Sequence, residues 1–183
     1  MNTSIRIAFT GASGTGKTTV AKQISTILGI PFNPIGSRSV AQSMGFGNPY
    51  DVDKAGKRAE FQRRLVTEKQ AWEDSHEDFV SDRTTVDNLC YTALHDVSAV
   101  DKNLLDQVET GMRRYTHVVL FPVKGFCKLS GDAARVQDMV YQRLFESALT
   151  GFLGTYGAGY RVLPLDCVGV NVRVQAILEM VRK

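Results

Sequence analysis

The sequence Gly11-Ala12-Ser13-Gly14-Thr15-Gly16-Lys17-Thr18 fits the pattern G-x-x-x-x-G-K-[ST]. Ahead of it, residues 5–10 form a short apolar run that is typical of a strand, and residues 18–28 have the periodicity of a helix. A glycine loop between a strand and a helix is the context that distinguishes a phosphate-binding P-loop from a chance Gly/Ser turn before a lysine. This stretch therefore predicts binding of a nucleoside triphosphate.

The residue types of the loop match the chemistry of a triphosphate. Glycine lets main-chain N–H groups approach phosphate oxygens without a Cβ in the way, and the following helix N-terminus adds partial positive charge. Lys17 supplies a mobile ammonium for the β- and γ-phosphates, and the Thr18 hydroxyl is a ligand for Mg²⁺. We therefore expect ATP and Mg²⁺ as cofactors, with the nucleotide held by Gly11, Ala12, Ser13, Gly14, Thr15, Gly16, Lys17, Thr18 and Thr19.

Length and composition predict an ordinary globular protein. The chain has 183 residues, of which 43% are hydrophobic and 22% charged, which suits one domain with a sizeable core. Its net charge of +3 permits a nucleic-acid partner without requiring one. The three cysteines, Cys90, Cys127 and Cys167, are odd in number and far apart, which argues against disulfides and zinc. No apolar stretch has the length of a membrane span and no signal peptide is recognisable, so we expect a cytoplasmic protein.

Strand-like and helix-like segments alternate along the whole chain. We expect strands at about 4–10, 30–35, 78–83, 116–122 and 160–165, and helices at about 17–28, 37–44, 54–75, 85–96, 101–114, 136–154 and 170–181. Pro31 and Pro34 place the second strand at a sheet edge. This alternation predicts an α/β fold, a five-stranded parallel sheet with helices on both faces, in a single P-loop domain spanning residues 1–183.

The predicted strand 78–83 ends in an acid and a base, Asp82 and Arg83. Asp82 would lie beside the P-loop, because the carboxyl ends of parallel strands meet at one edge of the sheet. Its carboxylate could hold Mg²⁺, directly or through water, or accept the proton of an attacking hydroxyl. The structural alternatives are a helix N-cap or an ion-pair partner for Arg83. The Asn-Lys-x-Asp motif of GTPases does not occur, which argues against a GTP switch.

Three stretches together resemble the small P-loop kinases akin to ribosylnicotinamide and nucleoside kinases, a group with many phage-encoded members. They are the P-loop, Asp82-Arg83 with residues 86–91, and Gly131–Asp138, and the resemblance spans most of the chain. It implies a phosphotransferase with an alcohol-group acceptor. The roles that it implies are phosphate contacts for Lys17 and Arg135, a place near Mg²⁺ for Thr18, catalytic base or metal partner for Asp82, and an acceptor-facing position for Arg83.

The segment between the fourth strand and the next helix is rich in charge. Small P-loop kinases place a mobile lid here, so we expect a lid at about 124–136. Arg135 would close over the phosphates and stabilise charge in the transition state, with Lys124 and Lys128 as weaker candidates. The alternative is a plain solvated loop.

The acceptor is expected to bind a helical region at about 36–75. Candidate acceptor-binding residues are Arg38, Tyr50, Arg58 and Arg83. Residues 54–73 hold six basic and three acidic side chains, a patch that could track a nucleic-acid backbone with an aromatic ring stacked on a base. The alternative is a solvated helix face carrying Glu–Arg pairs. The stretch 36–39 lacks the carboxylate that nucleoside kinases often carry there, and its arginine suits a phosphate-bearing acceptor.

These features lead to one specific hypothesis and two alternatives. In size and layout the chain resembles phage P-loop kinases that phosphorylate 5-hydroxymethyluracil within DNA. The hypothesis that this resemblance implies is an ATP-dependent kinase acting on that base in phage DNA, inside an infected bacterial host, where the acceptor base would have to leave the stack. The first alternative is a kinase for a free nucleoside or nucleoside monophosphate. The second, of another class, is an ATPase or nucleotide-binding regulatory module, which would hydrolyse ATP without any acceptor.

Overall fold

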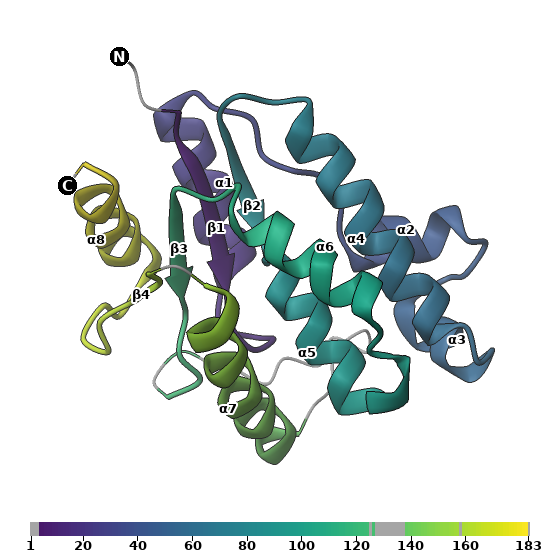
Figure 1. Cartoon of the computed structure of the whole chain (residues 1–183). Helices are drawn as coiled ribbons and strands as arrows, with labels where there is room; N and C mark the ends of the chain where they lie inside the picture. Colours follow the sequence, from purple (N-terminus) through teal and green to yellow (C-terminus); the bar gives the residue numbers. More distant parts are fainter. Residues whose placement is uncertain (1–3, 125, 127–137, 158, 183) are drawn as a thin grey trace.

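A parallel sheet forms the centre of the molecule. The computed structural model describes residues 4–124, 126, 138–157 and 159–182. Within these residues the sheet has four strands, in the order β2-β1-β3-β4 (Figure 1). The strands are β1 Arg6–Thr10, β2 Phe79–Asp82, β3 His117–Leu120 and β4 Arg161–Val162. β1 is therefore an inner strand, and the P-loop that follows it emerges between the ends of β2 and β3.

The strand expected at 30–35, the second of the five, is wrong, because the described sheet does not include it. Phe32 makes only an isolated parallel bridge to Val80. Two hydrogen bonds support it: Val80 N–H donates to the Pro31 carbonyl at 2.8 Å, and Asn33 N–H donates to the Val80 carbonyl at 2.8 Å. Pro31 has no N–H group to extend the ladder before the bridge, and after it the Ile35 N–H donates to the Asn33 side chain at 2.9 Å. The segment lies beside β2 at the sheet edge, as its prolines predict, without becoming a strand.

Helices cover both faces of the sheet, which confirms that part of the prediction (Figure 1). They are α1 Lys17–Leu28, α2 Ser37–Ser43, α3 Pro49–Lys54, α4 Arg58–Asp74, α5 Thr85–His95, the short 3₁₀ helix η1 Val97–Ala99, α6 Lys102–Met112, α7 Met139–Tyr156 and α8 Val170–Val181. The helix expected at 54–75 begins only at Arg58, as α4, and the separate short helix α3 precedes it. Gly56, with φ 67°, lies between them, and a left-handed residue cannot continue an α-helix.

Two apolar cores lie on opposite faces of the sheet. On one face α1 and α8 pack on β1 and β3. Here the Phe9 and Phe121 rings meet edge to face, with 5.5 Å between the ring centres. On the other face α5, α6 and α7 pack around Leu89, Val108 and Phe145. A third apolar cluster joins α2 and α3 to α4, so these three helices form a wall that projects beyond the sheet (Figure 1).

An ion pair ties the end of α4 to the segment that enters β3, and we expect its contribution to depend on pH. The Arg114 guanidinium donates to both carboxylate oxygens of Asp74, at 2.5 and 2.8 Å. This hydrogen bond lowers the pKa of Asp74 below its ordinary range. A carboxylate with a lowered folded-state pKa stabilises the protein above its unfolded-state pKa, and this stability is lost as pH falls through the folded-state value.

Replacing Arg114 with alanine should therefore lower the free energy of unfolding more at pH 7 than at pH 3. The Asp74 side chain is 57% exposed, so water screens the pair and we expect only about 0.5–1 kcal/mol at pH 7. Urea unfolding at both pH values measures the difference. Arg113→Ala, which removes a more exposed pair to Glu109, is the matched control. Equal losses at pH 7 and pH 3 for Arg114→Ala would contradict this interpretation.

Candidate active site

The P-loop joins β1 to α1 and has a backbone that requires glycine. Gly11, Gly14 and Gly16 have φ values of 132°, 79° and 88°. A Cβ on Gly11 would lie 2.5 Å from the carbonyl oxygen of Phe121, the residue after β3. Gly16 occupies the N-cap position of α1 in the left-handed conformation. The loop is therefore held tightly between two strands, with the start of α1 directed toward its interior.

Lys17 and Arg173 both donate hydrogen bonds to the P-loop. The Lys17 ammonium donates to the Ala12 carbonyl at 2.6 Å and to the Thr15 hydroxyl at 3.0 Å. Arg173, from the first turn of α8, donates to the Thr15 carbonyl at 3.1 Å and to the Cys167 carbonyl at 3.0 Å. The segment that precedes α8 consequently lies beside the P-loop.

Asp82 and Thr18 meet at the end of β2, as the strand order predicts. The Thr18 hydroxyl donates to Asp82 Oδ2. Asp82 Oδ1 is buried and has no hydrogen-bond partner among the residues that the structure describes. A buried carboxylate oxygen without a donor fits a cation, and a carboxylate with a hydroxyl is a donor set that suits Mg²⁺. The described part of the chain has no cluster of three or more His, Cys, Asp or Glu side chains that could hold a metal.

The two structural alternatives for Asp82 are a helix N-cap and an ion-pair partner for Arg83, and neighbouring residues fill both roles. Thr84 is the N-cap residue of α5 and forms a capping box with Asp87. Asp87, which is fully buried, is also the ion-pair partner of Arg83, at 3.0 Å. The Thr10 hydroxyl at the end of β1 donates to the same carboxylate at 2.7 Å. Asp82 is therefore left to face Thr18 and the P-loop.

Arg83 lines the cleft, and besides its ion pair with Asp87 it has two polar contacts with the P-loop. The guanidinium donates to the Gly11 carbonyl at 3.1 Å and to the Ser13 hydroxyl at 3.1 Å. It also lies over the Tyr91 ring, 4.9 Å from the ring centre. These contacts indicate that Arg83 supports the P-loop. The resemblance implied a different position for Arg83, one that faces the acceptor.

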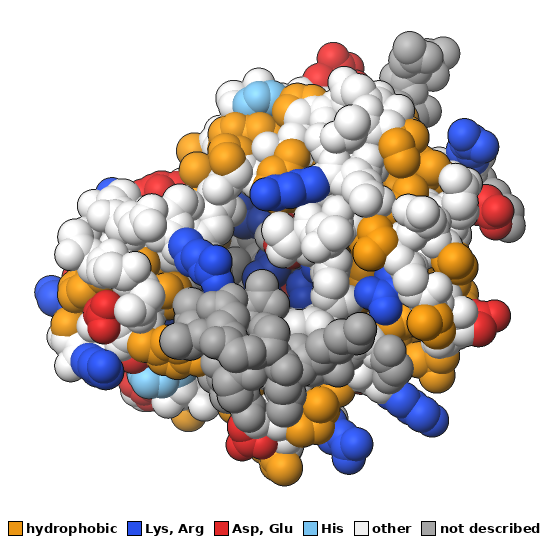
Figure 2. All heavy atoms as spheres, turned by 180° about the vertical axis from the view of Figure 1, so that it is seen from behind, with side chains coloured by type: hydrophobic (Ala, Val, Ile, Leu, Met, Phe, Trp, Pro, Cys, Tyr) orange, Lys and Arg blue, Asp and Glu red, His pale blue; other side chains and the backbone are white. Residues whose placement is uncertain are grey.

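A cleft of about 860 Å³ runs from the P-loop to the wall built by α2, α3 and α4. It is lined by Lys17, Thr18 and Asp82 at one end and by Arg38, Tyr50 and Arg58 at the other. Lys and Arg side chains gather around a hollow on the face turned away in Figure 1 (Figure 2). The structure thus brings the predicted donor and acceptor residues to one space. Arg135 and Lys128, predicted for the lid, lie outside the described residues.

Two amide side chains in the cleft wall escaped prediction. Asn88 Nδ2 donates to Gln62 Oε1 at 3.0 Å, across the contact between α5 and α4. The two residues are 4% and 3% exposed, and both line the cleft. The sequence signal for this pair is weak, because it amounts to Gln62 following Phe61 on the buried side of α4. The pairing with Asn88 depends on how α4 packs against α5, and the pattern of one helix does not reveal that packing.

Lys69, one of the six basic residues in the predicted patch at 54–73, is buried. Its ammonium donates to the Ser81 hydroxyl at 2.6 Å and to the Asp82 carbonyl at 3.0 Å. Glu73 lies 3.7 Å away. Burial lowers the pKa of Lys69, and the negative charges of Glu73 and Asp82 oppose this shift.

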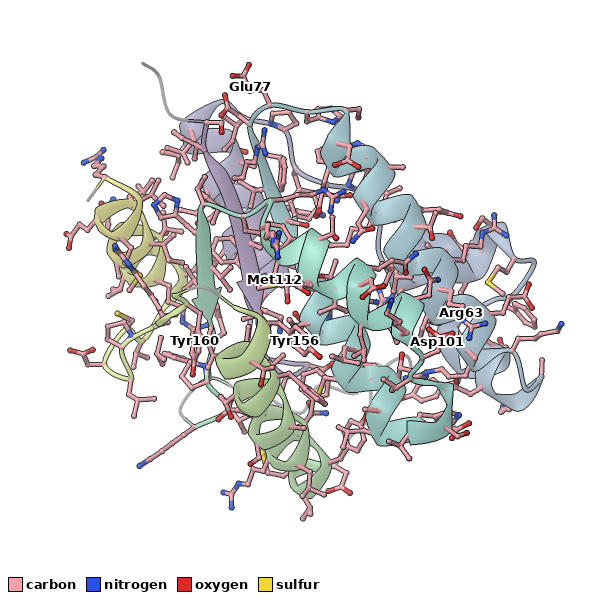
Figure 3. The ribbon with its side chains drawn as sticks, in the orientation of Figure 1. Arg63, Glu77, Asp101, Met112, Tyr156 and Tyr160 are labelled. Atoms are coloured by element: carbon pink, nitrogen blue, oxygen red, sulfur yellow. The ribbon has the colours of Figure 1, made fainter. Side chains whose placement is uncertain are left out.

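Most of the remaining basic patch is paired with carboxylates. Arg63 of α4 lies beside Asp101 at the start of α6, 2.9 Å away (Figure 3). The other pairs are Lys57 with Glu60 at 3.2 Å, Arg58 with Asp53 at 2.7 Å and Arg64 with Glu68 at 2.5 Å. The alternative of a solvated helix face with acid–base pairs therefore describes α4 better than a nucleic-acid-binding patch. Within the described residues no helix combines the length and apolar character needed to cross a membrane.

Comparisons with solved structures show the fold. Deoxyadenosine kinase from M. mycoides with bound dATP has a TM-score of 0.67 at 18% identity, covering 98% of this chain and 100% of that chain. NadR in complex with NR has 0.66 at 15%, covering 99% and 52%. Shikimate kinase from Aquifex aeolicus vf5 has 0.62 at 17%, covering 97% and 96%. At these identities the likeness establishes a shared P-loop kinase-like α/β fold.

Sequence comparison adds the family. A search of curated proteins gave no significant match. The model of the AAA_28 family, described as an AAA domain, matches residues 6–168. This range contains the P-loop, the Thr18–Asp82 contact and all of the cleft wall formed by α2 to α5. The chain therefore belongs to the AAA_28 family of AAA domains.

Proposed function

We propose that this chain is an ATP-dependent kinase that transfers the γ-phosphate of ATP to a hydroxyl group of a small nucleoside-type acceptor. The observation that carries the proposal is the single cleft that joins the P-loop and Asp82 to the wall of α2, α3 and α4. A phosphoryl transfer needs donor and acceptor side by side, with little covalent work by the protein. The kinases among the solved structures of similar fold support the same reaction class.

The residues at the donor end have distinct tasks. The P-loop N–H groups and Lys17 would bind the phosphates, and Thr18 with Asp82 would hold Mg²⁺, which neutralises charge on the transferring group. Asp82 is also placed to accept the proton of the attacking hydroxyl. The lid at about 124–136 and the contact of Arg135 with the phosphates are part of the proposal. The cytoplasm is the proposed setting, in keeping with ATP and Mg²⁺ as cofactors.

The acceptor end favours a small molecule with a base. The Gln62–Asn88 amide pair offers both donors and acceptors to the edge of a heterocycle, and Tyr50 offers an aromatic ring. A DNA acceptor, such as 5-hydroxymethyluracil in phage DNA, would call on basic side chains that track the backbone. The ion pairs of Lys57, Arg63 and Arg64 occupy those side chains. We therefore place the free nucleoside or nucleoside monophosphate first.

The test is transfer from γ-labelled ATP with Mg²⁺ to a panel of nucleosides, nucleoside monophosphates and DNA with or without 5-hydroxymethyluracil. We expect label on one class of small acceptor, and ADP production well above the acceptor-free background. Label on modified DNA alone would retain the kinase and overturn the small acceptor. ADP production that no acceptor raises would favour the ATPase or regulatory module and overturn the kinase.

A substitution at the amide pair tests the acceptor end. Gln62→Leu should raise KM for the acceptor about tenfold, because a buried polar group of the acceptor then loses its partner. KM for ATP should stay near the wild-type value, since Gln62 lies away from the P-loop. Gln23→Leu on the exposed face of α1 is the matched control. An unchanged acceptor KM in Gln62→Leu would remove the amide pair from the acceptor site.

A further inference from the structure

A pair of buried charges lies on α4 beside the carboxyl end of β2. Lys69 and Glu73, one helical turn apart, are 2% and 1% exposed. The Ser81 hydroxyl joins them, accepting from Lys69 at 2.6 Å and donating to Glu73 at 2.7 Å. The Tyr115 hydroxyl donates to Glu73 at 3.1 Å. Burying such a pair is a weak source of stability, because the desolvation of two ions offsets their attraction. Its presence calls for a role other than stability.

The main chain that this pair holds is that of Asp82. The Lys69 ammonium donates to the Asp82 carbonyl at 3.0 Å. The next residue, Arg83, has φ 79°, a left-handed conformation that costs a non-glycine residue about 1 kcal/mol or more. On the other side of the turn, the Arg83 N–H donates to the Phe9 carbonyl at 2.7 Å. Two hydrogen bonds therefore clamp a strained turn at the point where Asp82 meets Thr18.

We propose that Lys69 is a positioning residue that fixes the main chain of Asp82 and so directs its carboxylate toward Thr18 and the P-loop. The inference rests on the proposed function, because the role of Asp82 does. Lys69 shares a face of α4 with Gln62, and both line the cleft. One rigid helix thus connects the acceptor wall to the strand end that carries Asp82. Misplacement of a reacting group by about 1 Å can lower a rate about 100-fold, which is why such a clamp would matter.

The test uses a variant that removes both charges together. Lys69→Met combined with Glu73→Gln keeps the buried volume and leaves no unpaired ion, so its thermal unfolding should stay close to wild type. We expect kcat to fall about tenfold or more, with KM for ATP nearly unchanged. Lys69→Arg, which keeps a charged donor, should recover most of the rate. Lys102→Met with Asp106→Asn, an exposed pair of the same spacing on α6, is the matched control.

A second readout does not depend on activity. Hydrogen exchange at the amides of residues 82–84 should become faster in the Lys69→Met/Glu73→Gln variant, while the amides of β1 keep their protection. If that variant does not fold, Ser81→Ala, which removes one acceptor of Lys69 and leaves both charges, gives the same two readouts.

The outcomes separate the positioning role from the proposed function. A folded double variant with wild-type kcat, or with unchanged exchange at 82–84, would overturn the role of Lys69. A wild-type chain that transfers no phosphate would instead overturn the kinase, and the exchange measurement would then decide the positioning role by itself.

Discussion

Lys17→Met should lower kcat for phosphate transfer about 10³-fold while the protein stays folded. The Lys17 side chain is 5% exposed and its ammonium is held at the centre of the P-loop by Ala12 and Thr15. An ammonium at this place would stabilise the negative charge that develops on the phosphate oxygens during transfer. Methionine keeps the length of the stem, so the variant removes the charge with little change in packing.

Steady-state kinetics with ATP and the acceptor found in the panel measures the Lys17 effect. Circular dichroism and thermal unfolding establish that the variant is folded. Lys102→Met is the control, since Lys102 is 91% exposed on α6. A Lys17→Met protein with a rate within about tenfold of wild type would exclude a direct contact between Lys17 and the transferring phosphate.

Asp82→Asn should lower kcat about 10²- to 10³-fold and change ATP affinity far less. The amide can still meet the Thr18 hydroxyl, so the local fold is kept, but it is neutral and a poor base. If Asp82 holds Mg²⁺, the Mg²⁺ concentration that gives half the maximal rate rises in the variant. If Asp82 is the base, that concentration stays the same while kcat falls.

The dependence of the rate on Mg²⁺ concentration in Asp82→Asn distinguishes these two roles. Asp106→Asn, in an exposed pair on α6, is the matched control. Near-normal turnover in Asp82→Asn would show that Asp82 is neither base nor metal partner, and the Lys69 clamp would then lose its purpose.

The donor half of the site was predictable because its signals are local. The P-loop lies between a strand and a helix that adjoin it in sequence, and Asp82 ends a strand whose parallel pairing to β1 is fixed by the fold class. The prolines at 31 and 34 indicated an edge position. Whether the segment forms a strand or a single bridge depends on which of its N–H groups face β2. Such pairing cannot be read before the neighbour is known.

The acceptor half was less predictable because its signals are distant contacts. Arg63 reads as a free cation until Asp101, which lies 38 residues later in the chain, is placed beside it (Figure 3). Lys69 reads as a surface lysine on a charged helix, and only the packing of α4 on β2 makes it buried. Charge counts in a segment therefore overestimate its affinity for nucleic acid when the neutralising carboxylates come from elsewhere.

The position of β1 in the sheet has a consequence for synthesis of the chain. β1 is made first, but its two partners, β2 and β3, come 73 and 110 residues later. At a ribosomal rate of about 5–20 residues per second, its buried apolar residues wait for several seconds without a pairing edge. Closing such long loops also slows folding. We therefore expect the nascent protein to depend on protection of its first strand until β3 has left the ribosome.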